Sequence, residues 1–406
     1  MQLACQQQRA PPAPGGAATR AGARRPPRTR AAAVAVRAAA QQPQSGLSLL
    51  TWTSKLVPQG ALVSGAKAGW RLAWETMVRE LAPQDAGGGY ARPGYAFDEQ
   101  IGSARFPAES GRYHVYVGNA CPWCSRVLLA LAVTGLSRHV GVGWLADVPE
   151  RATRGGWIFE APDPVTGAHD LWGVYDALSP GFRGRCTAPL LIDAAARPRA
   201  AVSNESASIV RMLARLSLPG TPGVELVPAA LEAEIDALND QVYRSVNNGV
   251  YRCGFATTQA AYDAAAAELH GALASLDGRL GRTRFLLGDK FTEADLRLFP
   301  TIVRFDAVYA GIFRCGRRRV ADYANLQAWM RDVWQIKVPG GGLQVSDAID
   351  VDGCRRSYYS NLFPLNPSSI VPSGPTAADL GLDVPAGRGG HALAEVFHLR
   401  AGAGGA

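Results

Sequence analysis

The chain has 406 residues, which is enough for two or three domains of ordinary size. Its composition, with 47% hydrophobic and 19% charged residues, is typical of a soluble globular protein, and no run approaches the roughly 20 apolar residues that a membrane-spanning helix needs. The formal net charge is +8, but residues 1–74 hold ten basic residues and no acid, so the rest of the chain is close to neutral. The charge therefore gives no indication of nucleic-acid binding, and we expect neither nucleic acid nor membrane insertion.

Seven cysteines and six histidines are scattered along the chain. This scatter favours a reducing compartment over a secreted, disulfide-bonded framework. Cys121 and Cys124 form a CxxC pair, but the sequence offers neither a second such pair nor the histidine spacing that zinc requires. We therefore expect no metal.

Residues 1–40 consist mainly of Ala, Arg, Pro and Gln, with no acidic and no aromatic residue. Such a segment cannot bury enough surface to offset the entropy of ordering it, so we expect it to be disordered. Its arginine-rich, acid-free composition predicts an organelle transit peptide, with cleavage near residues 37–40. The expected destination is the chloroplast, with the mitochondrion as the alternative; a plain basic tail is the other interpretation.

Residues 41–110 are expected to form an N-terminal extension, helical toward the end of the stretch 47–78. An α/β pattern follows over residues 111–217. Residues 112–117 alternate as in a half-buried strand, and residues 121–134 predict a buried helix. A strand at 188–193 and a helix at 207–216 follow. The chain thus has a strand, then a helix that carries the cysteine, then a strand that begins at a proline, and finally a second helix. This order predicts a thioredoxin-like domain.

The remainder predicts an all-α domain. Residues 218–228 contain three prolines and two glycines, as a linker would, and residues 229–340 are almost entirely of helical pattern. Within them, Thr292 and Asp295 would form a capping box, with Phe291 and Leu296 as its hydrophobic staple. Residues 341–375 are expected to form a C-terminal extension that packs near the reactive centre, and the Gly/Ala-rich residues 376–406 to be a disordered tail. The expected fold class is thus an α/β thioredoxin-like domain followed by an all-α domain.

The candidate reactive residue is Cys121, which lies where a strand ends and a helix begins. Pro122 suits the first helical position, so Cys121 is the expected N-cap. Unpaired amides and the positive helix end favour the thiolate, and such placement can lower a cysteine pKa from about 8.5 into a range of about 3.5–7.5. That thiolate would attack disulfides, mixed disulfides and activated thioethers, whereas the alternative is a small core residue. Cys124, one turn further on, could either resolve a mixed disulfide or face the core.

Two further features are expected beside Cys121. In a thioredoxin-like layer, a cis bond before Pro189 would present the backbone of Ala188 to an extended peptide. Glu205 and Ser206 lie at a helix start, where free amides, a hydroxyl and the helix dipole provide a seat for a carboxylate. Taken alone they are an ordinary helix cap, but together with Cys121 and Pro189 they predict half of a glutathione site.

An ordered set of stretches between about residues 70 and 375 carries a resemblance to one family. They are ELAPQ (80–84), ESGRYH (109–114), NACPWCSR (119–126), GWIF (156–159), SNES (203–206), VNNGVY (246–251), GFATTQ (254–259), TEADLRLF (292–299), RFDAVY (304–309) and LNP (365–367). With these motifs the chain resembles the glutathionyl-hydroquinone reductases, the Xi class of glutathione transferases. The resemblance implies a glutathione S-transferase fold, glutathione as co-substrate, a glutathionyl-hydroquinone as substrate and a homodimer.

The resemblance also implies roles for single residues. Cys121 matches the family's nucleophile, and Tyr251 and Tyr358 match tyrosines that hold the hydroquinone ring and its hydroxyls, although both could be ordinary core aromatics. The positions that match glutathione-holding residues are Trp157, Glu205 and Ser206, with the backbone of Ala188 before Pro189 beside them.

The chain departs from the family pattern at three places. Cys124-Ser125 stands where family members usually have Ala-His, which would allow dithiol, glutaredoxin-like chemistry. Ala188 replaces the usual valine, and the residues around Tyr358 lack the histidine that usually follows the serine of this stretch. These departures concern the substrate range more than the thiol chemistry.

Three functions are consistent with these features. The leading interpretation is a reductase in which Cys121 takes glutathione from a glutathionyl-hydroquinone and a second glutathione resolves the mixed disulfide. The alternatives are a broader thioltransferase or dehydroascorbate reductase of the omega or lambda kind, and a non-catalytic binding subunit with the glutathione transferase fold. A cysteine in place of a hydroxyl residue argues against conjugating transferases, and the intact Cys-Pro-Trp argues against the binding subunit.

Overall fold

The computed structural model describes residues 58–152, 156–338 and 342–400. The chain divides into two units, Met1–Ala66 and Lys67–Ala406, and helix α2 (Gln59–Leu81) begins in the first of them. The expected transit peptide, residues 1–40, lies outside the described residues. Within the ranges that the structure describes, no helix combines the length and the apolar character needed to cross a membrane.

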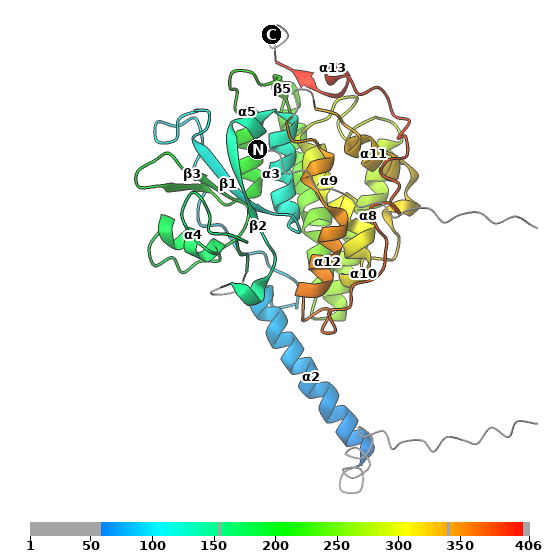
Figure 1. The fold of residues 1–406 in the computed structure, drawn as a ribbon. Coiled ribbons are helices and arrows are strands. Elements are labelled where there is room, and N and C mark those ends of the chain that lie inside the picture. The colour runs from blue at the N-terminus through cyan, green and yellow to red at the C-terminus, as the bar shows by residue number, and fades with distance from the viewer. Residues whose placement is uncertain (1–57, 153–155, 339–341, 401–406) are drawn as a thin grey trace, which may run out of the picture. The chain divides into compact units, whose positions relative to one another are not determined.

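The thioredoxin-like domain contains a four-stranded sheet with the order β2-β1-β3-β4 (Figure 1). Its strands are β1 (Tyr113–Gly118), β2 (Val140–Leu145), β3 (Leu190–Asp193) and β4 (Ala200–Ser203). β2 runs parallel to β1, whereas β3 runs antiparallel to both β1 and β4, so that Val115 pairs with Val142 on one side and with Leu191 on the other. The expected strand at 112–117 is confirmed with a shift of one residue. The expectation of a half-buried strand is wrong, because β1 lies inside the sheet and residues on both of its faces are buried.

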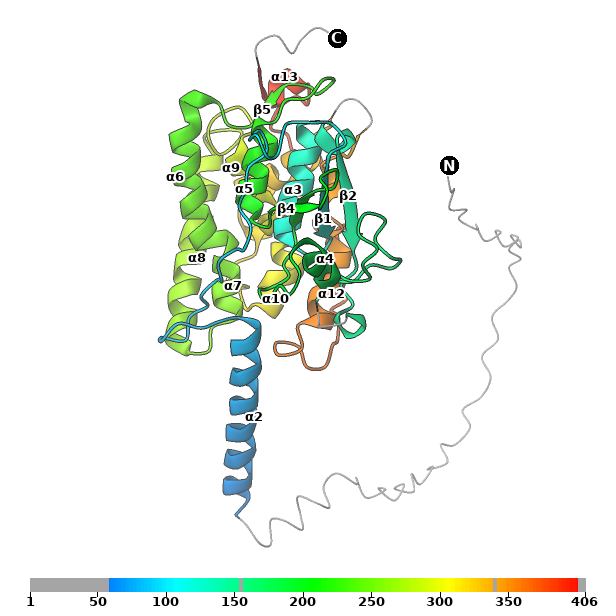
Figure 2. The ribbon, with the colours of Figure 1, turned by 90° about the vertical axis from the view of Figure 1, so that its left-hand side faces the viewer.

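Three helices accompany this sheet: α3 (Pro122–Val133), α4 (Leu171–Leu178) and α5 (Ser206–Arg215). All twelve residues of α3 are buried, as its apolar pattern predicts. α3 and α5 pack against each other and against α9 (Glu293–Arg304) of the helical domain, and Figures 1 and 2 show them between the sheet and that domain. The start of α3 is therefore placed where the two domains meet.

Residues 229–338 are mainly helical, as expected. The α-helices are α6 (Glu232–Val242), α7 (Gly249–Gly254), α8 (Gln259–Leu280), α9, α10 (Ala310–Ile312) and α11 (Ala324–Trp334). Two π-helical turns, Tyr243–Asn247 and Phe305–Tyr309, precede α7 and α10. Short 3-10 helices lie at Leu136–Arg138, Pro149–Arg151, Ala229–Leu231, Val320–Asp322 and Ser346–Ala348. The capping box of Thr292 and Asp295 is confirmed at the start of α9.

The C-terminal extension contains α12 (Val351–Asn361), which packs against α9 and the π-helical turn Phe305–Tyr309. Just before α12, the backbone of Asp350 exchanges two hydrogen bonds with the side chain of Asn119, at 3.0 and 3.2 Å. Asn119 belongs to the turn between β1 and α3. The extension is thus attached to the turn that precedes Cys121.

The expectation of a disordered tail from residue 376 is wrong for residues 376–400. These residues contain α13 (Leu393–Val396) and β6 (His398–Leu399), which pairs with β5 (Val224–Glu225) inside the expected linker 218–228. Arg388 donates to the carbonyls of Leu280, Thr283 and Arg284 at 2.6–2.9 Å. The Gly/Ala-rich composition hides a few large apolar residues, namely Leu380, Leu382, Val396 and Phe397, which are buried and order the segment.

Candidate active site

Cys121 is the N-cap of α3, as expected, with an extended backbone and Pro122 at the first helical turn. Its backbone amide donates to Gly118 O at 3.1 Å, which forms the tight turn between β1 and α3. The thiol lies 3.5 Å from Ala188 O, and the residue is partly exposed. The sulfur is therefore held at the end of the sheet, next to the backbone that the sequence predicted beside it.

Cys121 and Cys124 share one electrostatic environment. Burial raises the pKa of Cys121, but the neighbouring Cys124 thiol and the backbone amides of Cys124 and Trp123 outweigh burial and hold the pKa below its ordinary value. Cys124 is completely buried, and burial together with the hydrogen bond to Cys121 raises its pKa well above the ordinary value. Of the two thiols, Cys121 therefore loses its proton more readily, and Cys124 keeps its own.

Arg304 lies under the same turn, and sequence reasoning did not give it a role. It is fully buried, and its guanidinium donates to Ser125 Oγ (2.7 Å), to Asn119 O (3.0 Å) and to Pro300 O (3.0 Å). Its positive charge also lowers the pKa of Cys121. The signal in the sequence was a single arginine in the apolar second half of α9. Charged residues are almost never fully buried without partners, so an arginine at a buried position indicates polar groups around it.

A third thiol near this turn was also missed. Cys354, on α12, is buried and lies with its sulfur 3.3 Å from Asn119 O. Burial raises the pKa of Cys354, although the charge of Arg304 acts in the opposite direction. Only the position of Cys354 one turn before Tyr358 could have suggested it.

The residues predicted to hold glutathione lie at the edge of the sheet beside Cys121. The Ala188–Pro189 bond is cis, as expected. Glu205 is the N-cap of α5, and its carboxylate accepts from Ala207 N at 2.7 Å and lies 3.4 Å from Ser206 Oγ. Just before Glu205, Asn204 donates to Thr187 Oγ1 at 3.3 Å, which fixes the start of α5 next to the backbone of Ala188.

Trp157 lies against the carboxyl end of β1. A side-chain carbon at Gly118 would come within 2.4 Å of the Trp157 ring, so only a glycine fits at this position. Because Gly118 begins the turn to Cys121, the indole is packed beside the turn that carries the thiol.

Tyr251 and Tyr358 come together from α7 and α12, as the resemblance implied. Their hydroxyl oxygens lie 2.6 Å apart, and the hydroxyl of Tyr309 lies 3.5 Å from that of Tyr358. The Tyr251 ring also stacks on Trp123, with centroids 6.1 Å apart. Burial raises the pKa of both Tyr251 and Tyr358 well above the ordinary value, so both remain protonated at neutral pH.

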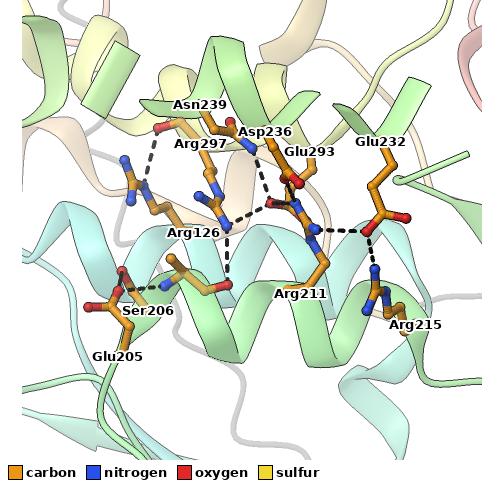
Figure 3. A network of polar contacts seen from close by, with 11 residues as sticks. Arg126, Glu205, Ser206, Arg211, Arg215, Glu232, Asp236, Asn239, Glu293 and Arg297 are labelled. Atoms are coloured by element: carbon orange, nitrogen blue, oxygen red, sulfur yellow. Dashed lines mark hydrogen bonds and ion pairs between the residues drawn. The ribbon is translucent and has the colours of Figure 1, made fainter. Parts of the chain in front are cut away.

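A network of buried charges joins α3 and α5 to the helical domain (Figure 3). Arg211 of α5 and Arg297 of α9 both pair with Glu293, each at 2.7 Å. Arg297 also donates to Ala207 O in the first turn of α5 (3.3 Å), and Arg126 of α3 donates to Arg297 O (3.2 Å). These contacts hold the start of α5 in a fixed position relative to α3 and its cysteine.

Over the described ranges, no group of three or more His, Cys, Asp or Glu side chains is placed to hold a metal ion.

Family models for two domains match the chain. The glutathione S-transferase N-terminal domain matches residues 120–216, and the C-terminal domain matches residues 259–332. These ranges contain the sheet with α3 and α5 and the larger part of the helical domain.

Curated relatives match over nearly their whole length. The glutathionyl-hydroquinone reductase of Sphingobium chlorophenolicum is 38% identical over 330 residues, which is 80% of this chain and 98% of that protein. The glutathionyl-hydroquinone reductase of Escherichia coli is 36% identical over 345 residues, covering 81% of this chain and 98% of that protein. An omega-like glutathione S-transferase of Schizosaccharomyces pombe is 34% identical and covers 74% of this chain and 97% of that protein.

Solved structures give the same result. The Xi glutathione transferase of Phanerochaete chrysosporium superposes with a TM-score of 0.64 at 37% identity, over 70% of this chain and 97% of that one. The glutathione-bound structure of a glutathione transferase homologue from Escherichia coli superposes with a TM-score of 0.64 at 36% identity, over 75% of this chain and 94% of that one. The shared fold, the relatives' full-length match and the cysteine at the start of α3 lead to one conclusion: the chain belongs to the glutathionyl-hydroquinone reductases, the Xi class of the glutathione transferase superfamily, and is an oxidoreductase of that family.

Proposed function

We propose that this protein reduces glutathionyl-hydroquinones to hydroquinones with glutathione as co-substrate. The observation that carries the proposal is the position of the Cys121 sulfur, 3.5 Å from Ala188 O and at the N-terminus of α3, with a pKa below the ordinary value. In the first step the Cys121 thiolate attacks the glutathione sulfur, so that an S–S bond forms and the bond between sulfur and the ring carbon breaks. The ring carbon keeps the electron pair, takes up a proton, and the hydroquinone leaves.

In the second step a second glutathione, as its thiolate, attacks the mixed disulfide. Its sulfur bonds to the sulfur of the first glutathione, the Cys121 thiolate is regenerated, and oxidised glutathione leaves. The hydrogen bond from Cys124 and the charge of Arg304 stabilise the Cys121 thiolate as a leaving group as well as a nucleophile.

The ring side of the substrate would meet Tyr251 and Tyr358. Both hydroxyls are protonated and adjacent, so at least one can donate to a ring oxygen while the other accepts. Such donors hold the ring by its oxygens and so position the carbon–sulfur bond for attack by the thiolate. The family resemblance also supports a homodimer as part of the proposal.

One observation favours a second candidate activity, a broader thioltransferase or dehydroascorbate reductase. The Cys124 thiol hydrogen-bonds to Cys121, which is the arrangement that a dithiol mechanism needs, and omega-like transferases are among the relatives. This activity would use the same Cys121 with smaller oxidised substrates.

A steady-state assay distinguishes these activities. The full chain is incubated with a glutathionyl-hydroquinone, with or without glutathione, and compared with Cys121→Ser. We expect continuous release of hydroquinone and oxidised glutathione with glutathione present, at most one hydroquinone per active site without it, and no release from the serine variant. A value of kcat/KM that is higher for dehydroascorbate or a glutathione mixed disulfide than for the glutathionyl-hydroquinone would support the second activity instead, and absence of hydroquinone release would contradict the proposal.

A further inference from the structure

Residues 84–99 form a segment, here named the strap, that is fixed to both domains of the site. Near its start, Gly88 O accepts from Thr257 N (3.0 Å) and Gly87 O accepts from Thr258 Oγ1 (2.9 Å), between α7 and α8. Near its end, Phe97 N donates to Asn204 Oδ1 (3.2 Å), directly before Glu205. Figure 2 shows this part of the chain passing along α7 and α5. The middle of the strap is thereby held beside the expected glutathione residues.

The strap places a guanidinium on the aromatic ring next to the nucleophile. Arg92 lies 4.0 Å from the centroid of Trp123, and Arg126 of α3 lies 4.5 Å from the same ring. Among the residues that the structure describes, no carboxylate oxygen lies within 4.0 Å of either guanidinium. The guanidinium groups of Arg92 and Arg126 therefore lie at the same ring, and neither forms an ion pair with a carboxylate.

The charge at this place is unbalanced and partly buried. Arg126 is only 2% exposed, and burial, together with the charges of Arg297 and Arg92, lowers its pKa to about 9, although Glu205 acts in the opposite direction. The nearby Arg297 is already paired with Glu293. A buried cation without a carboxylate partner is costly, so the site favours an anionic ligand.

The strap also places Tyr95 beside the start of α5. Arg92 Nε donates to the Tyr95 hydroxyl at 3.0 Å. Burial raises the pKa of Tyr95, the charge of Arg92 acts in the opposite direction, and the carboxylate of Glu205 raises the pKa further. Arg92 and Tyr95 line a pocket of about 330 Å³, whose other walls include Thr187 and Asn204, the neighbours of Ala188 and Glu205.

We propose that the strap clamps the γ-glutamyl end of glutathione. Arg92 pairs with the α-carboxylate of this end, the charge of Arg126 adds to the attraction, and Tyr95 closes the site beside Glu205. The inference rests on the proposed function, since it takes glutathione as the ligand. The γ-glutamyl end carries one carboxylate and one ammonium group, which complement the two arginines and Glu205 respectively. Planar guanidinium groups bind carboxylates through two parallel hydrogen bonds, which lysine cannot reproduce.

The test measures the binding of S-methylglutathione, which cannot form a disulfide, by titration calorimetry of the full chain. We expect Arg92→Ala to raise the Kd about tenfold or more, because a charged hydrogen bond is lost. Arg92→Lys recovers part of the loss, and Tyr95→Phe causes a smaller one. Arg105→Ala is the matched control: Arg105 is 65% exposed, pairs with Glu99 at 3.0 Å and lies outside the pocket, so the Kd should not change.

A second ligand decides which end of glutathione Arg92 holds. With S-methylglutathione whose glycine carboxylate is amidated, the ratio of the Arg92→Ala Kd to the wild-type Kd should stay the same. A ratio that falls to one with the amide would assign Arg92 to the glycine end and overturn the proposal, as would an unchanged Kd for S-methylglutathione itself. If the wild-type chain binds S-methylglutathione but releases no hydroquinone, the proposed function fails while the clamp is still tested by the same ratio.

Discussion

The hydroxyl oxygens of Tyr251 and Tyr358 lie 2.6 Å apart, although 107 positions separate the two residues in the chain. The contact joins α7 of the helical domain to α12 of the C-terminal extension. The extension therefore completes the side of the site that would receive the hydroquinone.

Tyr358→Phe should lower kcat/KM for a glutathionyl-hydroquinone by about tenfold, because a donor to the ring oxygen is lost. The Kd for S-methylglutathione should stay unchanged, since Tyr358 lies on the ring side. Tyr359→Phe, one residue further on the same helix, is the control and should have wild-type kinetics. Wild-type kcat/KM in Tyr358→Phe would show that this tyrosine is a core aromatic only.

Cys124→Ala should raise the pKa of Cys121, because the hydrogen bond that lowers it is removed. Since the thiolate is the reactive form, the acid limb of the pH profile of kcat/KM should move to higher pH. Well above both pKa values the variant should keep most of its hydroquinone reductase activity, while the reduction potential of the protein changes. The pH dependence of alkylation of Cys121 by iodoacetamide measures the same shift directly.

Cys253→Ala serves as the control for this variant, because it removes a buried thiol from α7 and leaves the start of α3 intact. Loss of nearly all turnover in folded Cys124→Ala, together with a Cys121–Cys124 disulfide in the oxidised wild-type protein by mass spectrometry, would show instead that Cys124 is the resolving thiol.

Asp295→Ala should lower the free energy of unfolding by about 3 kcal/mol or more, because several buried donors lose their acceptor. The carboxylate accepts from Leu286 N (2.9 Å), Trp329 Nε1 (2.9 Å) and Thr292 N (3.1 Å). Asp322→Ala is the matched control: this exposed capping carboxylate accepts from Arg319 N (2.8 Å), and its loss should cost about 1 kcal/mol. Urea unfolding measures both values, and equal losses would contradict the prediction.

The same carboxyl predicts a pH dependence. Burial raises the pKa of Asp295 to about 6 in the folded protein, whereas an unfolded Asp titrates near about 3.9. The folded state therefore binds this proton more tightly than the unfolded state does. The stability that protonation of Asp295 contributes is fully present below about pH 3.9 and is lost as the pH rises through 6. Asp295→Asn should lack this loss between pH 4 and 6.

Residues 1–40 should direct a fused fluorescent protein to the chloroplast and should be dispensable for reductase activity. The reason is the arginine-rich, acid-free composition of the segment. Replacement of Arg24, Arg25, Arg28 and Arg30 by glutamate provides the control, which should stay in the cytosol. Import into mitochondria would support the alternative destination, and a cytosolic wild-type fusion would contradict the transit peptide.

The sequence predicts the reactive turn well because its determinants are local. Cys121 and Pro122 define the start of α3, Thr292 and Asp295 define the start of α9, and the confirmed elements are shifted by only one or two residues. The residues that define each helix start are within three positions of one another, as in the capping box of Thr292 and Asp295.

The features that sequence reasoning missed depend on contacts between distant segments. Arg304 reaches Ser125 across 179 positions, and the strap meets Asn204 across 107 positions. No local pattern contains such pairs, so Arg304, Cys354 and Arg92 were unassigned. The burial of both faces of β1 was missed for the same reason, since it depends on what packs against the sheet.

The ordering of residues 376–400 has a practical consequence for work with this protein. Phe291, the staple residue before α9, donates its amide to Val396 O at 2.7 Å, and its ring packs edge-on against Phe397 with centroids 5.5 Å apart. A shortened version that stops at residue 375, where the resemblance to the family fades, would uncover Phe291 and remove the partner strand of β5. Because α9 also carries Arg304, such trimming would weaken the packing that holds Arg304 against the turn before Cys121. Expression boundaries and affinity tags should therefore be placed beyond residue 400.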